Sequence, residues 1–339
     1  MGAIGFHLLC AVVYVQNLTI FIFMKIDELL KEAKSVAIFG HVRPDGDCVG
    51  STLGLYNYIC DNYPTTKVRI FLERFPENYK ILSNANEINE FYSDEFGSFD
   101  LAFLLDSSTF DRVGANGESC LKAAKKTCNI DHHVSNPLNL CDVNYVDAKA
   151  SSACEALYFL LDPNKVSKAT AECLYLGIVH DTGAFKFSST GHKTMTVIGD
   201  LLEKGIDFTR IINETYYTRT YTQTLVTGYV MMSSKLALDG KVVYSYITPE
   251  DMNRYSVTPV ELSSVIDTLR EVTGTEVAIF LYPVNGEYKI SLRSNYVVDV
   301  NKVAGVFGGG GHVRAAGASS KDSPEETIAK LLKVIQEQL

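Results

Sequence analysis

Positive charge is scarce in this sequence. Its 339 residues include 31 lysines and arginines against 40 aspartates and glutamates, so the formal net charge is −9. Proteins that hold long nucleic acid need a broad basic surface, because much of their affinity comes from counterion release. We therefore expect no long nucleic acid as a partner. An anionic substrate should be small, or should be gripped by metal ions and a few placed cations.

Cysteine pairs of the kind that bind zinc are also missing. The eight cysteines lie between Cys10 and Cys173, no two of them form a C-x-x-C pair, and no cysteine–histidine spacing resembles a zinc site. Internal repeats and low-complexity segments are absent as well. Free, mostly buried thiols are typical of a reducing compartment, so we predict a cytoplasmic protein.

The first 24 residues contain no aspartate, glutamate, lysine or arginine. Residues 3–23 are long enough to span a bilayer, but the basic start and the A-x-A cleavage site of a secretory signal are missing. Three interpretations remain open: a membrane anchor, an apolar extension packed on the protein, and a misassigned start with Met24 as the first residue. We favour the third, with the anchor second. We expect no membrane association unless residues 3–23 are an anchor.

The rest of the chain has the composition of a globular protein, with 46% hydrophobic and 21% charged residues, and its length suits two domains. Short apolar runs that read as buried strands lie at 35–39, 67–72, 101–105 and 127–130. Amphipathic stretches such as 50–60 and 150–161 separate them. This alternation predicts an α/β domain over residues 24–190, with a parallel sheet and helices on both faces.

The pattern changes in the second half of the chain. Residues 191–234 read as a helical linker with few breakers. Hairpins are predicted around Asp239-Gly240 and around Asn285-Gly286. Helices are predicted at 259–272, before the glycine run, and at 324–338. Residues 235–339 should therefore form a smaller α+β domain.

Four polar segments stand at the ends of predicted elements of the first domain. The first follows a strand directly and brings His41, Asp45 and Asp47 within seven residues, a ligand set that suits a divalent cation. The others are Asp106 after a strand, Asp131-His132-His133 after a strand, and His180-Asp181 at the end of an apolar helix. Each aspartate alone could be a helix cap. Because open α/β sheets bind ligands at the carboxyl ends of their strands, we interpret the four segments as one site.

The combination resembles the DHH phosphoesterase family, which is named for the motif that stands here as Asp131-His132-His133. In the second domain, the run Gly308-Gly309-Gly310-Gly311-His312-Val-Arg314-Ala-Ala-Gly317 resembles the signature of the DHH-associated C-terminal domain. The resemblance covers residues 24–339.

The resemblance implies a role for each position. Two divalent cations would be held by two sets of ligands that share Asp106 as a bridge. The mix of imidazole and carboxylate ligands suits Mn²⁺ better than Mg²⁺, which stays an alternative. Asp131 would orient a histidine, and His133 would face the substrate phosphate as a catalytic group beside Asp106. The implied metal ligands are His41, Asp45 and Asp106 for one ion and Asp47, Asp106, His132 and Asp181 for the other. The implied substrate-binding residues are His133, Arg293, Gly309, Gly310, Gly311, His312 and Arg314.

A pair of domains with no further module looks like the branch of bifunctional oligoribonucleases and 3′-phosphoadenosine 5′-phosphate (pAp) phosphatases. The expected substrates are then short RNA oligonucleotides and pAp. A phosphodiesterase for pApA or cyclic dinucleotides is the nearest alternative. An inactive nucleotide-binding regulator is an alternative of another class, which the intact ligand set disfavours. A family II pyrophosphatase and a RecJ-like exonuclease rank lower. A homodimer stays open as an assembly state.

Overall fold

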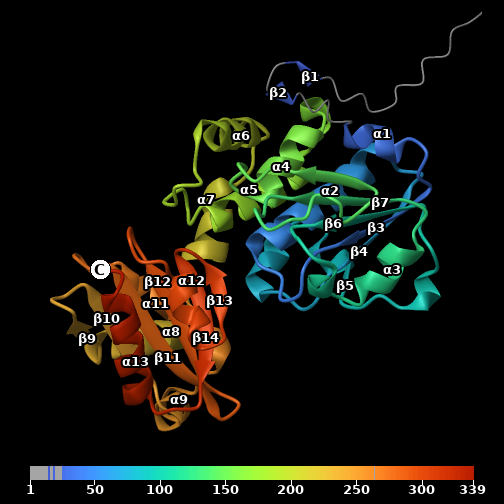
Figure 1. The fold of residues 1–339 in the computed structure, drawn as a ribbon. Helices are drawn as coiled ribbons and strands as arrows, with labels where there is room; N and C mark the ends of the chain where they lie inside the picture. Colours follow the sequence, from blue (N-terminus) through green and yellow to red (C-terminus); the bar gives the residue numbers. More distant parts are fainter. Residues whose placement is uncertain (1–13, 16–17, 20–24, 263) are drawn as a thin grey trace, which may run out of the picture. The chain divides into compact units, whose positions relative to one another are not determined.

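In the computed structural model the chain forms two compact units, Met1–Thr218 and Arg219–Leu339 (Figure 1). The structure describes residues 14–15, 18–19, 25–262 and 264–339. Most of the apolar segment 1–23 lies outside the described residues. Four of its residues form β1 (Tyr14–Val15) and β2 (Leu18–Thr19), which pair antiparallel. No helix in the described ranges is long and apolar enough to cross a membrane.

A sheet of six parallel strands, in the order β5-β4-β3-β6-β7-β8, forms the centre of the first unit. The strands are β3 (Ser35–Phe39), β4 (Lys67–Phe71), β5 (Ile88–Asn89), β6 (Leu101–Leu105), β7 (Thr127–Asp131) and β8 (Val143–Val146). The chain runs from β3 outward to β5 and then returns to β6, beside β3. The strand order therefore reverses between β3 and β6, and such a switch point is where open α/β sheets bind ligands.

Helices cover both faces of this sheet, as the α/β interpretation predicts. Side chains alternate along β6: Leu101, Phe103 and Leu105 enter one apolar core, while Ala102 and Leu104 enter the other. Figure 1 shows α2, α4 and α5 on one side of the sheet and α3 on the other. The helices of this unit are α1 (Ile26–Leu30), α2 (Gly46–Asn62), α3 (Gly117–Ala123), α4 (Ala153–Leu160), α5 (Lys168–Asp181), α6 (His192–Glu203) and α7 (Phe208–Ile212).

Shorter turns complete the first unit. They are the 3₁₀ turns η1 (Glu77–Ile81), η2 (Ala85–Glu87), η3 (Asp94–Phe96), η4 (Phe110–Arg112) and η5 (Pro163–Lys165), and the π-turn η6 (Asn213–Tyr217). Residues 191–234 are largely helical. They contribute α6, α7 and η6 to the first unit and α8 (Tyr221–Met232) to the second, because the boundary between the units falls after Thr218.

The second unit is an α+β domain with a six-stranded mixed sheet in the order β13-β14-β12-β11-β10-β9. Its strands are β9 (Lys235–Ala237), β10 (Val242–Tyr246), β11 (Val277–Val284), β12 (Glu287–Ser294), β13 (Gly310–His312) and β14 (Ala315–Ser320). The two hairpins predicted from the sequence are confirmed, because β9 pairs antiparallel with β10 and β11 with β12. The sequence did not predict β13 and β14.

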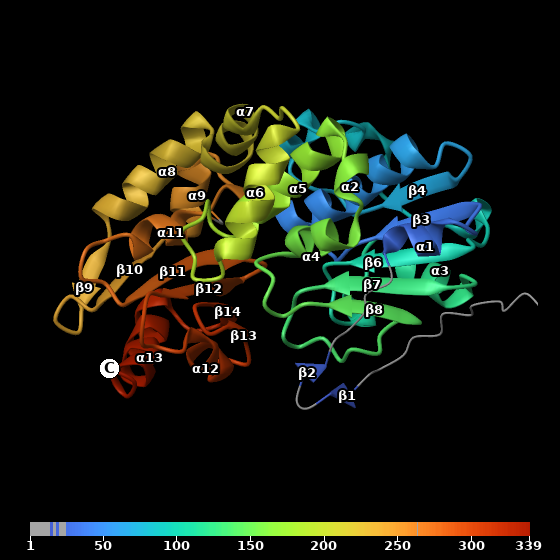
Figure 2. The same cartoon turned by 90° about the horizontal axis from the view of Figure 1, so that it is seen from above.

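Two layers of helices enclose this second sheet. Figure 2 shows α12 and α13 on one side and α8 and α11 on the other, and a separate apolar core lies on each side. The helices are α9 (Pro249–Tyr255), α10 (Pro259–Leu262), α11 (Val265–Arg270), α12 (Val300–Gly305) and α13 (Pro324–Gln336).

Candidate metal centre

His41 follows β3 at the switch point of the first sheet. Its Nδ1 donates a hydrogen bond, at 2.8 Å, to the carbonyl oxygen of Val42, and this contact turns Nε2 toward the carboxylates of the site. Nε2 lies 3.3 Å from Asp106 Oδ2 and 3.7 Å from Asp45 Oδ1. His41 is buried, so its ring is held in one place. It therefore has the tautomer and the position of a metal ligand.

The start of α2 supplies two carboxylates. Asp45 caps the helix, since its Oδ1 accepts hydrogen bonds from the amides of Asp47 and Cys48, and its side chain is 59% exposed. Asp47 is fully buried in the first turn. Its two oxygens accept hydrogen bonds from the amides of Ala153, at 2.6 Å, and Cys154, at 2.9 Å, at the beginning of α4. The amino end of α4 thus fixes a buried carboxylate beside the site.

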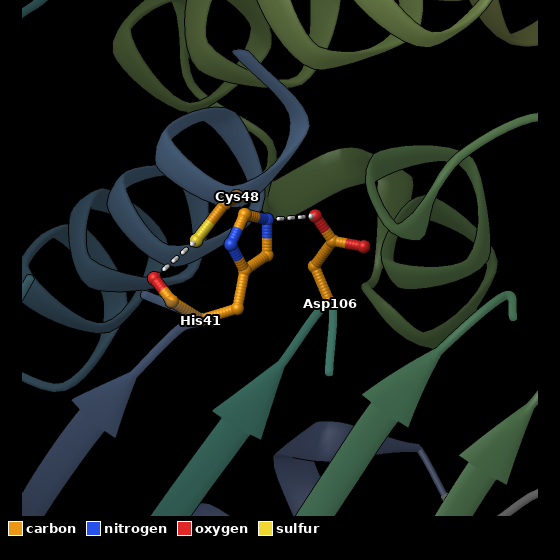
Figure 3. A group of neighbouring side chains, drawn as sticks. All are labelled: His41, Cys48 and Asp106. Carbon is orange, nitrogen blue, oxygen red and sulfur yellow. Dashed lines mark hydrogen bonds and ion pairs between the residues drawn. The ribbon is translucent and has the colours of Figure 1, made fainter. Parts of the chain in front are cut away.

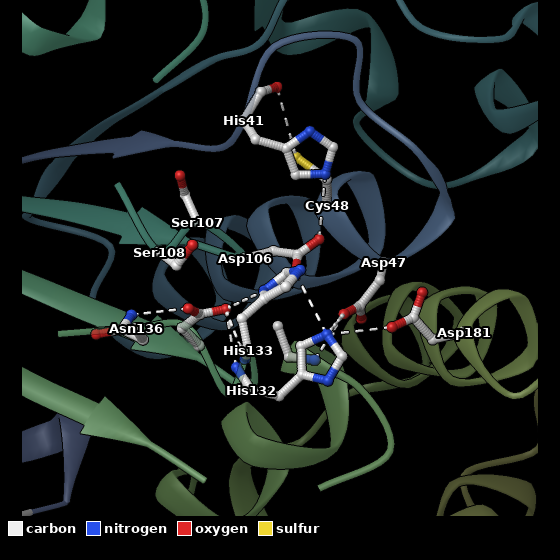
Figure 4. Close-up of polar contacts among 12 residues, drawn as sticks. His41, Asp47, Cys48, Asp106, Ser107, Ser108, His132, His133, Asn136 and Asp181 are labelled. Carbon is white, nitrogen blue, oxygen red and sulfur yellow. Dashed lines mark hydrogen bonds and ion pairs between the residues drawn. The ribbon is translucent and has the colours of Figure 1, made fainter. Parts of the chain in front are cut away.

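Asp106, directly after β6, lies at the centre of the cluster (Figure 4). Its φ of 53° is in the left-handed region, which few residues other than glycine adopt and which aspartate tolerates better than most. Oδ2 faces His41, while Oδ1 lies 3.6 Å from His132 Nε2. Among the residues that the structure describes, none donates a hydrogen bond to the buried Oδ1. One oxygen of this carboxylate therefore faces His41, and the other faces His132 and, at 3.7 Å, the Nδ1 of His133.

The DHH segment continues β7. Asp131 is fully buried, and its Oδ1 accepts a hydrogen bond from the amide of His132 and lies 2.7 Å from His133 Nδ1. The Asp131 carboxylate, through this hydrogen bond, raises the pKa of His133. His132 Nε2 lies 3.2 Å from Asp181 Oδ2 and 3.8 Å from Asp47 Oδ2. Asp131 thus orients the ring of His133, while His132 faces a separate group of carboxylates.

Asp181, the last residue of α5, reaches the site because α5 packs closely against α2. A Cβ at Gly177 of α5 would lie 2.7 Å from Asp47 Oδ1, and one at Gly50 of α2 would lie 2.5 Å from the carbonyl oxygen of Cys173. Both positions therefore exclude any side chain. The close approach of the two helices brings Asp47 and Asp181 to one histidine, His132.

Cys48 is a neighbour of the cluster that the sequence did not predict. Its thiol lies near the ring of His41 and donates a long hydrogen bond, at 4.0 Å, to the His41 carbonyl oxygen (Figure 3). The thiol is close enough to share a metal ion with two of its neighbours: the possible ligand atoms of Cys48, His41 and Asp106 all lie within 4.8 Å of one another. Burial raises the pKa of the Cys48 thiol to about 11, which keeps it protonated at neutral pH.

The carboxylates of the cluster repel one another. Burial raises the pKa of Asp47 well above its usual value, and the charges of Asp106 and Asp181 raise it further. Burial also raises the pKa of Asp106 to about 6, with Asp45 and Asp181 adding to the effect and His41 opposing it. A divalent cation would reverse this balance, because it favours the ionised form of every carboxylate that faces it.

Two asparagines that sequence reasoning missed hold the segment in place. Asn136 Nδ2 donates to Asp131 Oδ2 at 2.7 Å and to Asn129 Oδ1 at 2.8 Å. Asn129 Nδ2 in turn donates to the carbonyl oxygens of Leu104 and Ser107, on either side of Asp106. The ends of β6 and β7 are thereby tied together. Asn136 lies three positions after His133, and no sequence signal at that spacing indicates its contact with Asp131.

The sequence-predicted residues of the second unit lie on β12, immediately before and on β13, and in the turn between β13 and β14. Arg293 Nε donates to Asp267 Oδ1 at 3.1 Å. Arg314 donates to the carbonyl oxygens of Tyr296 and Val298, so its guanidinium holds the loop after β12. His312 is exposed in β13.

Two glycines of the signature allow β13 to lie close to β14. A Cβ at Gly309 would lie 2.2 Å from the carbonyl oxygen of Gly317, and one at Gly311 would lie 2.5 Å from that of Ala315. The Gly311 amide donates a hydrogen bond to Asn301 Oδ1 at 2.9 Å, so this amide already has a partner inside the domain. Gly310 has more room, with Asn301 Oδ1 at 3.5 Å from its ideal Cβ.

Comparison with known proteins gives the same division of the chain. Residues 35–178 match the DHH family, N-terminal domain, and residues 239–339 match the DHHA1 domain. The chain is 29% identical over 312 residues to a probable bifunctional oligoribonuclease and PAP phosphatase NrnA of Streptococcus mutans serotype c, covering 90% of this chain and 96% of that protein. It is 28% identical over 312 residues to the bifunctional oligoribonuclease and PAP phosphatase NrnA of Bacillus subtilis, covering 89% of this chain and 95% of that one.

A solved structure agrees over nearly the whole length. The exopolyphosphatase-related protein from Bacteroides fragilis matches with a TM-score of 0.83 and 25% identity, covering 92% of this chain and 94% of that chain. Both matched domains occur in the same order as the two units, and the relatives extend over both. The chain therefore belongs to the DHH family of phosphoesterases.

Proposed function

We propose that this phosphoesterase holds two divalent cations and hydrolyses short oligoribonucleotides and pAp to mononucleotides. The observation that carries the proposal is the position of Asp106, whose two oxygens face His41 on one side and His132 on the other. The names of the relatives, oligoribonuclease and PAP phosphatase, support the substrate class.

The residues present fit a pair of metal ions. No described residue supplies a hydrogen bond to the buried Oδ1 of Asp106, and a metal ion would give this oxygen a partner. One ion would be held by His41, Asp45 and Asp106 Oδ2. The other would be held by Asp47, His132, Asp181 and Asp106 Oδ1, and the first three of these lie within 4.8 Å of one another. Mixed imidazole and carboxylate ligands favour Mn²⁺ over Mg²⁺, which prefers oxygen ligands and water.

The chemistry of the site follows from these positions. Two ions bound there would supply an activated water and stabilise the entering and leaving oxygens of an in-line displacement. The protein supplies four carboxylates, which bring the charge of the occupied site close to zero and let an anionic phosphate approach. His133, oriented by Asp131 and with its pKa raised, would donate a hydrogen bond to a phosphate oxygen.

The length of the substrate is the second part of the proposal. Arg293, Gly310 and His312 would contact the part of the nucleotide that does not react, while Gly309, Gly311 and Arg314 shape the backbone around them. A chain with a net charge of −9 offers few further phosphate contacts, so affinity should stop rising after a few nucleotides.

A substrate panel tests the proposal. The panel holds pAp, pApA, a cyclic dinucleotide and RNA of two to about twenty nucleotides, each with Mn²⁺ and with Mg²⁺. We expect kcat/KM to be highest for RNA of about two to five nucleotides, with pAp also hydrolysed. Asp106→Asn is the inactive control. A rate that rises steadily with RNA length, with pAp untouched, would contradict the proposal. A preference for pApA or the cyclic dinucleotide would favour a dinucleotide phosphodiesterase.

A further inference from the structure

Three arginines lie at the carboxyl edge of the first sheet, beside the candidate metal centre. Arg43 follows β3, Arg74 follows β4, and Arg112 belongs to η4, which follows β6. The three strands are neighbours in the sheet, in the order β4-β3-β6. All three arginines are exposed. Because parallel strands bring the segments that follow them to one edge, these cations lie at the same edge of the first unit as His41 and Asp106.

Hydrogen bonds hold the three arginine-bearing segments together. The amide of Val42 donates to the carbonyl oxygen of Arg112 at 2.8 Å, which places the backbone of Arg112 against the turn that carries Arg43. The amide of Arg43 donates to Glu73 Oε2 at 2.9 Å, which ties it to the residue before Arg74. We call Arg43, Arg74 and Arg112 the arginine patch. Its members come from three segments that touch one another.

Arg43 is the member of the patch nearest to the metal ligands along the chain. It lies two positions after His41 and two positions before Asp45. Its φ is 55°, in the left-handed region that few residues other than glycine adopt. Such a conformation persists only where surrounding contacts impose it, and it is concentrated at ligand sites. The hydrogen bonds from the amides of Val42 and Arg43 impose it here.

The guanidinium groups of the arginine patch are available to an anion. Within the ranges that the structure describes, none of the three forms an ion pair or a hydrogen bond. Two carboxylates lie on the same three segments. Glu73 accepts the hydrogen bond from the Arg43 amide, and Asp111 forms no ion pair with an arginine of the described ranges. The three segments thus carry three positive and two negative charges, in a chain whose net charge is −9.

We propose that the arginine patch binds the phosphate next to the scissile one in a short oligoribonucleotide. The inference deepens the proposed function and rests on it: the metal ions would hold the reacting phosphate, and the patch would hold its neighbour. Both sites belong to the first unit. Arginine presents a planar fork of donors that matches two phosphate oxygens at once, and it stays charged at neutral pH. One added phosphate contact fits a preference for very short RNA.

The test measures what one terminal phosphate adds to binding. Three dinucleotides, each with a non-hydrolysable methylene phosphonate as the internal linkage, are titrated into the Mn²⁺-loaded protein: one without a terminal phosphate, one with a 5′-phosphate and one with a 3′-phosphate. In the wild type at least one terminal phosphate should strengthen binding about 10-fold or more. In Arg43→Met and in Arg112→Met this gain should fall to about 3-fold or less, and in the double variant nearly to one.

Matched variants separate a phosphate contact from a general effect. Lys126→Met removes one exposed charge at the opposite, amino edge of the same sheet and should retain the full gain. Arg43→Lys keeps the charge but not the fork of donors, so it should retain part of the gain. Arg112 contacts the turn after His41 through its carbonyl oxygen, which a substitution leaves in place, so Arg112→Met should bind as much metal as the wild type.

Three results would refute the phosphate subsite. They are a full gain in both arginine variants, an equal loss of affinity for all three dinucleotides, and a wild type that gains nothing from either terminal phosphate. A loss of the gain in Lys126→Met as large as that in Arg112→Met would refute it too, because the effect would then follow net charge alone.

Failure of the proposed function would look different. A wild type that shows the arginine-dependent gain but hydrolyses neither pAp nor short RNA would contradict the assigned activity and leave the phosphate subsite standing.

Discussion

The substitution Asp106→Asn should raise the stability of the metal-free protein and abolish its activity. Asp106 is 3% exposed, and burial among other carboxylates raises its pKa from 3.8 to about 6. A shift of about two pH units corresponds to about 3 kcal/mol. This is the free-energy cost that the folded, metal-free protein bears when the buried carboxyl group of Asp106 ionises. The cost is absent below pH 3.8, grows as the pH rises, and is complete above about pH 6. Asparagine cannot ionise, so it avoids the penalty, although it loses the attraction to His41.

Urea unfolding in EDTA measures the effect. At pH 7.5 the variant should be more stable than the wild type by up to about 3 kcal/mol, and the difference should shrink as the pH is lowered toward 4. With excess Mn²⁺ the wild type should become the more stable of the two proteins, because it gains metal-binding free energy that the variant lacks. Turnover should fall about 10³-fold or more. Equal stability of the two proteins at all pH values, or a variant that keeps appreciable activity at saturating Mn²⁺, would refute the reasoning.

Three further substitutions test other parts of the molecule. Asp131→Asn should lower kcat about 10- to 100-fold with an unchanged metal content, because His133 loses the carboxylate that orients it; an unchanged kcat would exclude that role. Arg293→Ala should raise KM for pAp and lower kcat without releasing metal, which steady-state kinetics and metal analysis check together. Asp27→Asn should cost about 1–3 kcal/mol of unfolding free energy at pH 7. Burial alone would raise the pKa of Asp27, but hydrogen bonds from two tyrosines and from Lys165 lower it overall. The stability that the ionised Asp27 contributes should therefore disappear as the pH falls below 3.8. An identical acid dependence in wild type and variant would contradict this.

The first domain was predictable because its signals are local and repeated. The run 101–105 is apolar throughout, as a strand buried on both faces requires, and β6 has these bounds. A polar residue that follows such a strand must lie at the carboxyl edge of a parallel sheet, so the grouping of His41, Asp106 and His132 followed from topology. The structure brings these three side chains together.

Other features depend on contacts that leave no local pattern. Residues 315–320 contain only alanine, glycine and serine, which have little preference for strands, and β14 forms because β12 and β13 pair with it on both sides. The contact of Asn136 with Asp131 depends on how the chain turns after His133. The engagement of Arg314 with the loop after β12 likewise appears only in three dimensions.

The central claim is that one carboxylate, Asp106, joins two metal ions, and metal counting tests it most directly. The protein is loaded with Mn²⁺, freed of excess metal by gel filtration, and measured for bound metal per chain, beside three single variants and one double variant. We predict two ions for the wild type, one each for His41→Ala and Asp181→Ala, and the largest loss for Asp106→Asn. Because the two single-site variants would retain different ions, combining them should remove both. A wild type that binds one ion, or a double variant that still binds one, would contradict the two-metal centre.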